Sequence, residues 1–191
     1  NDVATTVAEQ TFPRLTYGTH PYAHLSIGTD ASLRRVTPDD VVSFHTRAVQ
    51  PARATLVVCG AMSHDELLRH AEDAFGGWPA VADDLNTATP ASEIVPARAP
   101  LIRLAVVPRE SAAQSELRIG HLSARRDTPD YSPLLVMNAV LGGQFVSRIN
   151  LKLREEKGYT YGARTGFDWH RGLAPFSMQA SVHTAATVDA I

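Results

Sequence analysis

The sequence has a single cysteine, Cys59, and only two lysines, Lys152 and Lys157, among its 18 basic residues. One cysteine excludes an internal disulfide, and the apolar run around Cys59 leads us to expect a buried structural thiol rather than a nucleophile. The 20 acidic residues bring the net charge to -2. A chain without a charge excess has no electrostatic footprint for nucleic acid or an anionic membrane, so we expect neither as a partner.

Long apolar runs and a targeting segment are also lacking. No run approaches the roughly 20 apolar residues of a membrane-spanning helix, and the first residues lack the basic start and apolar centre of a signal peptide. The chain also looks cut at both ends. Val188 and Ile191 begin an apolar stripe that stops after about one turn, and so short a helix is marginal alone. We therefore expect a missing continuation, and no compartment is assigned.

What is present is an ordinary globular composition. With 191 residues, 44% of them hydrophobic, the chain is long enough for one large domain or two small lobes. Between Trp78 and Pro100 the hydrophobic periodicity disappears and prolines are interspersed with Ala, Asp and Thr. We interpret residues 79–99 as a mobile linker between one lobe, 1–78, and another, 100–191.

Helices and strands are predicted from periodicity and from capping residues. Helices are expected at 3–15, where Pro13 should fray the end, at 38–50 after the cap Thr37, and at 64–75 after a capping box that Ser63 and Glu66 form. Apolar runs predict strands at 54–59, 101–107 and 116–122, the last two as a pair. Thr128-Pro129-Asp130 repeats the capping chemistry of Thr37-Pro38-Asp39 and should open a helix that is apolar nearly all round and central.

The densest run of signals extends from Leu141 to Tyr161 and reads LGGQFVSRINLKLREEKGYTY. Its glycine pair can end a helix, and a second helix with Phe145, Ile149 and Leu153 on one face stops at Gly158. Strands at 159–169 and 174–183 follow and should form an antiparallel pair, with Tyr161 on the same face as Ala163. Separate runs of helices and antiparallel strands indicate an α+β fold.

This run resembles the signature of the second half of the pitrilysin/insulysin-type zinc peptidases, the inverzincins, which include the mitochondrial processing peptidases. Further matches lie upstream at His20-Pro21-Tyr22, Gly28, Cys59-Gly60 and Gln114. The resemblance implies two lobes of antiparallel sheet packed against helices. Residues 1–78 would end the zinc-domain-like lobe, and residues 100–191 would start the second, non-zinc and inactive domain.

The resemblance also implies roles for Arg154 and Tyr161. In the family these positions bind the substrate backbone and help to stabilise the tetrahedral oxyanion, which suits a guanidinium and a phenol as donors. Two structural readings remain open. Arg154 near a helix end also complements the helix dipole, and Tyr161 shares its predicted strand face with core aromatics. Glu155 and Glu156 point about 100° apart on a helix and are read as a solvated face.

The inverted zinc motif His-x-x-Glu-His is absent from the sequence. His20 and His24 flank Pro21 in an irregular segment and are read as turn-stabilising or solvated, and His64 and His70 lie on a predicted surface helix without a third ligand. We therefore expect no metal site in this chain, no zinc bound by it alone and no peptidase activity of its own, with zinc in the full-length parent if that parent is active.

Three functions are weighed. The chain is either part of a zinc endopeptidase that contributes substrate binding and oxyanion stabilisation, or a non-catalytic paralogous subunit that binds peptide or assembles with an active partner. Its partners would be a peptide substrate and either the remaining segments of the same chain or a homologous subunit. An unrelated α+β binding domain is the third reading. A His-x-x-Glu-His motif upstream of Asn1 would separate the first two.

Overall fold

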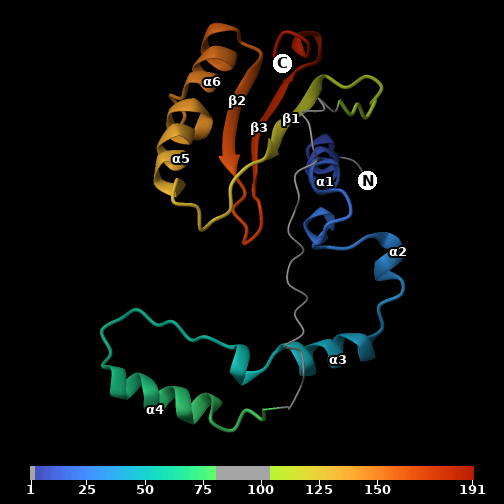
Figure 1. Ribbon diagram of the computed structural model, residues 1–191. Coiled ribbons are helices and arrows are strands. Elements are labelled where there is room, and N and C mark those ends of the chain that lie inside the picture. The colour runs from blue at the N-terminus through green and yellow to red at the C-terminus, as the bar shows by residue number, and fades with distance from the viewer. Residues whose placement is uncertain (1–2, 81–103) are drawn as a thin grey trace. The chain divides into compact units, whose positions relative to one another are not determined.

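The computed structural model describes residues 3–80 and 104–191, which group into two compact units (Figure 1). The first unit combines the described residues of 1–26 and 91–191, and the second those of 27–90. The predicted lobe 1–78 includes residues of both units. The helix at its start packs against a strand of the predicted lobe 100–191, and residues 81–99 of the predicted linker lie outside the described residues.

The first unit holds a sheet with helices beside it. Its elements are α1 (Ala4–Tyr17), a 3-10 turn (Pro21–Ala23), β1 (Gln114–Leu122), α5 (Tyr131–Asn138), a π-helical turn (Ala139–Gly143), α6 (Arg148–Asn150), a second π-helical segment (Leu151–Glu156), β2 (Thr160–Phe167), β3 (Pro175–His183) and a 3-10 turn (Thr184–Ala186).

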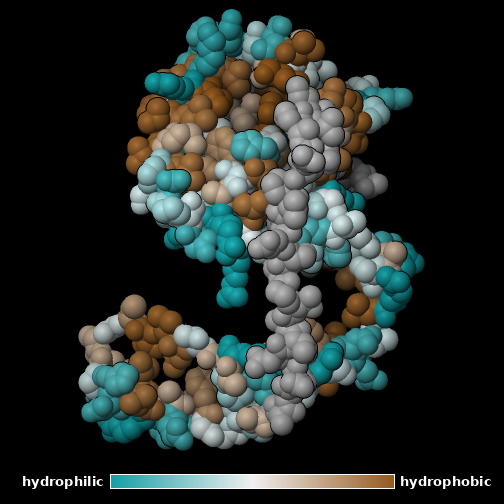
Figure 2. All heavy atoms as spheres, in the orientation of Figure 1, coloured by the Kyte–Doolittle hydropathy of each residue, from teal (hydrophilic) through white to brown (hydrophobic). Residues whose placement is uncertain are grey.

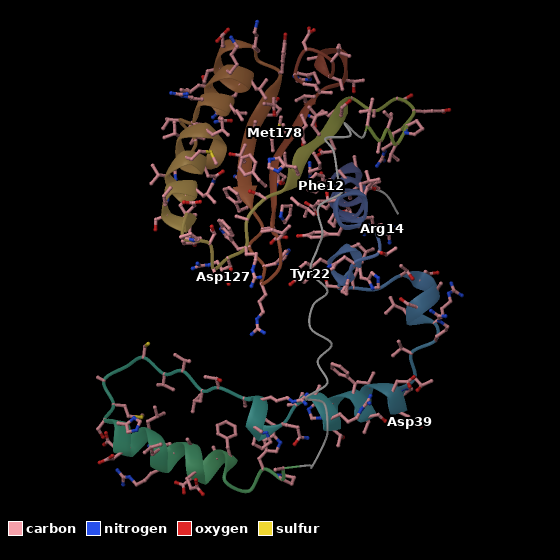
Figure 3. The ribbon with its side chains drawn as sticks, viewed as in Figure 1. Phe12, Arg14, Tyr22, Asp39, Asp127 and Met178 are labelled. Carbon is pink, nitrogen blue, oxygen red and sulfur yellow. The ribbon has the colours of Figure 1, made fainter. Side chains whose placement is uncertain are left out.

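The three strands form an antiparallel sheet in the order β1-β3-β2, so the predicted pairing of β2 with β3 is confirmed (Figure 1). Together with the neighbouring helices this sheet confirms the α+β fold class. Small and branched side chains fill the core, which consists of Leu117, Leu153, Ala163, Ala180, Val182 and Ala190. Met178 of β3 packs against this core from within the sheet (Figure 3).

The helix α1 covers β1. A Cβ added at Gly120 of β1 would stand 2.9 Å from the ring of Phe12, which is on α1 (Figure 3). At the end of α1 the buried Tyr17 hydroxyl donates to the carbonyl oxygen of Leu173 at 2.9 Å. This helix runs through Pro13 to Tyr17, so the prediction that Pro13 would fray the end of a helix at 3–15 was wrong. Pro13 removes one hydrogen-bond donor, and the packing of the helix on the sheet outweighs that loss.

A cluster of rings lies beyond the end of α1. The Tyr22 ring (labelled in Figure 3) lies 4.5 Å from the His170 ring and 5.5 Å from the Tyr17 ring, and its hydroxyl accepts from the Gly172 N–H at 3.4 Å. His20 Nδ1 accepts from the Tyr22 N–H at 3.1 Å. The turn-stabilising reading of His20 is therefore confirmed.

The helices α5 and α6 lie along β2 (Figure 1). The glycine pair between them does not adopt positive φ, unlike Gly158, which ends the second helix with φ 65°. Gly142 is required for another reason, because an added Cβ would stand 2.8 Å from the backbone nitrogen of Thr165. The absence of a side chain at this position lets the π-helical turn approach the strand closely.

Several predictions for this helical stretch were wrong. The helix α5 begins at Tyr131 rather than directly after Thr128, and Phe145 lies in an exposed turn instead of on a buried helical face. The α5 helix is not central either. Figure 2 shows apolar atoms gathered over this helical stretch. Leu135, Val136 and Met137 of α5 and Val140 of the following π-helical turn are exposed among the described residues.

The stretch Tyr131–Glu156 has, by length and composition alone, the character of a membrane-crossing helix. A single stretch of this kind is weak evidence for a membrane span, because core helices pass the same test. The stretch is also interrupted, since Gln144 adopts extended geometry between the two helical parts. Gly142 and Leu153 are buried, which fits a helix that packs along a sheet.

The second unit is helical in its described part. It contains α2 (Asp30–Leu33), α3 (Pro38–Ala48), a 3-10 turn (Pro51–Arg53) and α4 (His64–Phe75). The predicted capping box of Ser63 and Glu66 is present at α4, and the predicted cap Thr37 forms a further capping box with Asp40 at α3. The predicted inward positions Ala74 and Phe75 of α4 are exposed.

Residues 54–59 and 104–107, which lie in two predicted strands, have no strand partner among the described residues, and β1 pairs with β3 there. Residues 101–103 of the second predicted strand lie outside the described residues. Val57 is 79% exposed and Cys59 is exposed, so the expected buried thiol was wrong. A β-rich run forms a strand only when a partner satisfies its backbone, and propensity alone does not supply one.

Candidate functional site

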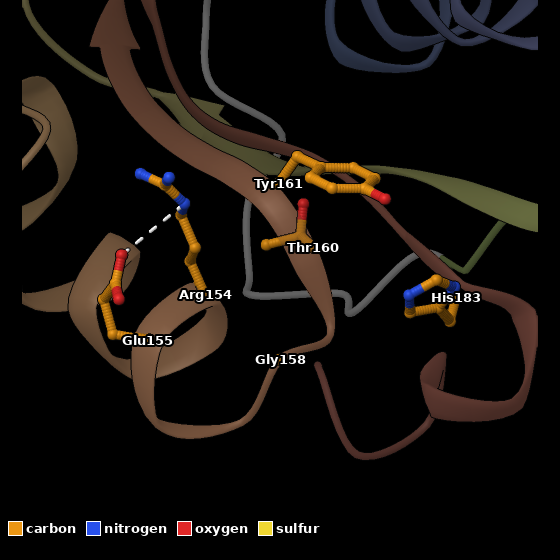
Figure 4. Close-up of a pocket in the computed structure, with 6 residues that line it drawn as sticks. All are labelled: Arg154, Glu155, Gly158, Thr160, Tyr161 and His183. Carbon is orange, nitrogen blue, oxygen red and sulfur yellow. Dashed lines mark ion pairs between the residues drawn. The ribbon is translucent and has the colours of Figure 1, made fainter.

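A pocket of about 330 Å³ lies where the second helical stretch of the first unit meets β2 (Figure 4). The turn at Gly158 brings the end of the helix back against the start of the strand, so residues from both elements face one space. The lining residues are Arg154, Glu155, Gly158, Thr160, Tyr161 and His183. Arg154 and Tyr161, predicted from the sequence, thus line the same pocket, which we call the Arg154–Tyr161 pocket.

The Arg154 guanidinium is held on one side of the pocket. Its Nε lies 3.5 Å from Glu155 Oε1 (Figure 4). Its Cζ stands 4.2 Å from the centre of the Phe145 ring. Its Nη1 is buried, and no described residue accepts a hydrogen bond from it. A buried donor without an acceptor is uncommon, so this nitrogen retains hydrogen-bonding capacity for another group.

The Tyr161 phenol extends from the strand on the side of the pocket where His183 lies, away from the guanidinium (Figure 4). Its side chain is 84% exposed, so the reading of Tyr161 as a core residue was wrong. The cause is an irregularity in the strand between Thr160 and Ala163. Thr160, Ala163 and Thr165 face the core, whereas strict alternation would have buried Tyr161 with Ala163.

The two glutamates are solvated, as predicted. Glu155 pairs with Arg154, and Glu156 pairs with Lys152 Nζ at 2.5 Å on the exposed helix surface. The hydrogen bond from Lys152 is the main cause that lowers the pKa of the Glu156 carboxyl below its ordinary value. Both side chains are therefore engaged with a neighbouring cation and do not form an acid/base pair.

Sequence reasoning missed two residues. His183 lines the pocket, although the strand pattern marked it only as a polar position at the end of β3. Asn150 is 3% exposed and joins the helix to β2, since its Oδ1 accepts from the Ala163 N–H at 2.9 Å. The sequence did carry a signal for Asn150, because it is a polar residue one turn before Arg154 on a helix with a buried face.

A zinc site does not fit the described residues. They contain no group of three or more His, Cys, Asp or Glu side chains placed to hold a metal ion. His64 and His70 are exposed on α4, and His20 Nδ1 is engaged in the Tyr22 turn. No chemical step in this part of the chain can therefore be assigned to a metal ligand.

Comparison with known proteins gives the context of this pocket. Residues 35–191 match the family model described as the peptidase M16 inactive domain. An uncharacterized zinc protease from Mycobacterium leprae is 27% identical over 166 residues, which cover 86% of this chain and 36% of that protein. An uncharacterized zinc protease from Bacillus subtilis is 23% identical over 160 residues, covering 84% of this chain and 37% of that protein. The chain thus spans less than half the length of these relatives.

Solved structures share the fold. A peptidase M16 inactive domain from Pseudomonas fluorescens superposes with a TM-score of 0.77 at 24% identity, covering 97% of this chain and 43% of that one. A protease from Helicobacter pylori gives a TM-score of 0.77 at 19% identity, covering 91% of this chain and 42% of that one. Since the family model covers most of the sequence, the chain belongs to the M16 peptidase family and matches the region that the model describes as its inactive domain.

Proposed function

We propose that this chain is the part of a zinc endopeptidase that binds the peptide substrate, with Arg154 and Tyr161 as donors to the substrate backbone and to the developing oxyanion. Support comes from the names of the relatives as zinc proteases and from the Arg154–Tyr161 pocket. By the resemblance, residues 1–78 would end the zinc-domain-like lobe and residues 100–191 would start the non-zinc domain, with α1 of the first segment packed against β1 of the second. The peptide would be held between this chain and the rest of the enzyme or a homologous subunit.

The observation that carries the proposal is that two residues with hydrogen-bond donors, Arg154 and Tyr161, line one pocket from different sides. Arg154 Nη1 has no acceptor among the described residues, and Tyr161 presents a phenol that is not held in the core. A carbonyl oxygen that gains negative charge during hydrolysis needs preorganised donors, and a fixed guanidinium and a phenol supply them. The Phe145 ring and the Glu155 carboxylate orient the guanidinium before substrate arrives.

The described residues take part only in binding and charge stabilisation. The attacking water and its activation require a metal centre that these residues do not form. The proposed division of labour therefore assigns the bond-breaking chemistry to zinc held outside them and the orientation of the peptide to this pocket.

The test is peptide hydrolysis by the full-length protein that carries this chain. Replacement Arg154→Ala should lower kcat by about 10²-fold, the scale of one lost oxyanion donor. Arg154→Lys keeps the charge without the planar fork and should recover only part of that loss. The matched control is Arg164→Ala, an exposed arginine on β2 outside the pocket, which should leave kcat within about threefold. Parent-like kcat in Arg154→Ala would contradict the proposal.

A second function is favoured by the description of the matched family model as an inactive domain. In that case the chain belongs to a non-catalytic subunit that binds peptide or assembles with an active partner. The two functions separate on one observation, which is the presence or absence of His-x-x-Glu-His in the rest of the protein. A protein without the motif that raises hydrolysis by an added active homologue would support the subunit reading.

A further inference from the structure

The backbone irregularity beside Tyr161 is a β-bulge with one extra residue in β2. Thr160 pairs with Val182 and Ala163 pairs with Ala180, so three steps along β2 correspond to two steps along β3. Tyr161 and Gly162 together stand opposite Ser181. An extra residue reverses the faces on either side of it, which is why Thr160 and Ala163 are both buried while Tyr161 is exposed.

Two side chains close this bulge. The Thr160 hydroxyl donates to the Gly162 carbonyl oxygen at 2.9 Å and accepts from the Gly162 N–H at 3.1 Å. The Ala163 N–H, at the other end of the bulge, donates to Asn150 Oδ1 at 2.9 Å. Side chains thus satisfy backbone groups within the bulge and at its end.

The Asn150 amide is engaged at both ends. Its Oδ1 accepts from Ala163, and its Nδ2 donates to the Phe145 carbonyl oxygen at 2.5 Å. Phe145 carries the ring on which the Arg154 guanidinium rests. One buried side chain therefore links the turn beneath Arg154 to the bulge that carries Tyr161, and both donors of the pocket depend on it for their placement.

We infer that Asn150, together with Thr160, is a positioning residue that holds the β2 bulge and thereby turns Tyr161 out of the core and into the pocket. Without these hydrogen bonds, a shift of β2 by one residue would restore regular strand pairing and would become favourable. That shift would carry Tyr161 toward the buried face. The effect of Asn150 on the β2 backbone does not depend on what the pocket does. Its effect on turnover rests on the proposed function.

The test is amide hydrogen exchange on this chain, followed by NMR, with Asn150→Ala as the variant. The Ala163 amide should exchange roughly tenfold faster or more, while amides of the central strand β3 report whether global stability has changed. The matched control is Asn138→Ala, because Asn138 Oδ1 also accepts a hydrogen bond on β2, from the Thr165 hydroxyl at 2.8 Å, outside the bulge. That control should leave Ala163 exchange, relative to β3, within about threefold.

A second probe reports the side chain itself. In protein labelled with 3-fluorotyrosine, the Tyr161 resonance, assigned with Tyr161→Phe, should move from its exposed position in Asn150→Ala and stay in place in Asn138→Ala. Unchanged Ala163 exchange and an unchanged Tyr161 resonance in folded Asn150→Ala would overturn the inference. If Asn150→Ala does not fold, Thr160→Val provides the test, because it keeps the side-chain shape and removes the hydroxyl. It should expose the Gly162 amide to exchange and shift the Tyr161 resonance. Thr160→Ser keeps the hydroxyl and should do neither.

Turnover of the full-length protein distinguishes a positioning role of Asn150 from a purely structural one. Asn150→Ala should lower kcat in the parent but much less in a Tyr161→Phe background, since the hydroxyl it positions is already absent. Equal losses in both backgrounds would contradict positioning through Tyr161. If Tyr161→Phe itself turns over at the parent rate, the proposed function fails, while the exchange and fluorine results still decide the inference about the bulge.

Discussion

At the scale of single residues, Tyr161 illustrates what a sequence pattern can and cannot specify. The motif from Leu141 to Tyr161 was enough to select Arg154 and Tyr161, and both line one pocket. Alternation in the strand wrongly suggested a buried tyrosine, because a bulge depends on side-chain partners distant in sequence, such as Asn150, which lies 13 residues before Ala163. Periodicity does not contain that information.

The two environments of tyrosine in this protein predict opposite costs for the same substitution. Tyr161→Phe should change the free energy of unfolding by less than about 0.5 kcal/mol, since the hydroxyl lies on an exposed side chain. Tyr17→Phe should cost about 1 kcal/mol, because it removes the buried hydrogen bond to the Leu173 carbonyl oxygen. Urea unfolding of both variants measures the difference. Equal costs would show that the Tyr161 hydroxyl is bonded in solution.

At the scale of elements, local signals were reliable where the chemistry is local. The cap Thr37 and the capping box of Ser63 and Glu66 involve residues at most three positions apart and were predicted correctly, as was the helix stop at Gly158. The run 54–59 shows the opposite case, since its composition is strand-like but its partner must come from elsewhere. Gly142 was predicted to end a helix by positive φ, whereas it permits a close approach to Thr165 that only the tertiary structure reveals.

The approach of Gly142 to β2 predicts that a methyl group there is destabilising. Gly142→Ala should reduce the free energy of unfolding by roughly 1–3 kcal/mol, because the new Cβ would overlap Thr165 and the helix would have to move outward. Gly166→Ala is the control on β2, the strand that Gly142 approaches, because an added Cβ at Gly166 meets no atom within 4 Å. Thermal or urea unfolding of the two variants measures this difference. An unchanged free energy of unfolding in Gly142→Ala would refute the close contact.

The capping boxes predict a pH dependence of helix stability. Hydrogen bonds from Thr37 and Ser63 lower the pKa of the Asp40 and Glu66 carboxyls from their ordinary values of 3.8 and 4.5. A carboxyl pKa that is lower in the folded state stabilises it above the unfolded pKa, and this contribution is lost as pH falls through the lowered value. The caps should therefore weaken only in acid, below about pH 4.5.

Two variants test this assignment against each other. Thr37→Ala should raise the pKa of Asp40 toward its ordinary value and leave Glu66 unchanged, and Ser63→Ala should do the reverse. Carboxyl carbon shifts followed by NMR across the acid range give both values from one titration. A pKa of Asp40 that is insensitive to Thr37→Ala would remove the hydrogen bond as its cause.

At the scale of the whole molecule, the sequence predicted the family and the α+β class, and both are confirmed by the family match and by the shared fold. The apolar residues that remain uncovered in the described chain, such as Val57 and Val136, could not be assigned a neighbour from the sequence. The chain covers less than half of its relatives, and contacts with segments outside it are not encoded in its own periodicity.

The absence of a metal-compatible cluster among the described residues, like the absence of the zinc motif from the sequence, predicts the behaviour of the isolated chain toward zinc. Chelator-treated and zinc-reloaded protein should retain well below one equivalent after dialysis, and it should not hydrolyse peptides. Elemental analysis measures the metal content. About one tightly held zinc per chain would show that residues outside the described set complete a site.

The most direct test of the central claim is the turnover number of Tyr161→Phe in the full-length protein, with Tyr159→Phe as its control. Tyr159 precedes the strand, packs partly against the core and does not line the pocket. We expect kcat and kcat/KM to fall together by about 10²-fold for Tyr161→Phe, because a donor used in the transition state is lost, and to stay within about threefold for Tyr159→Phe. A Tyr161→Phe enzyme that turns over at the parent rate would contradict the account.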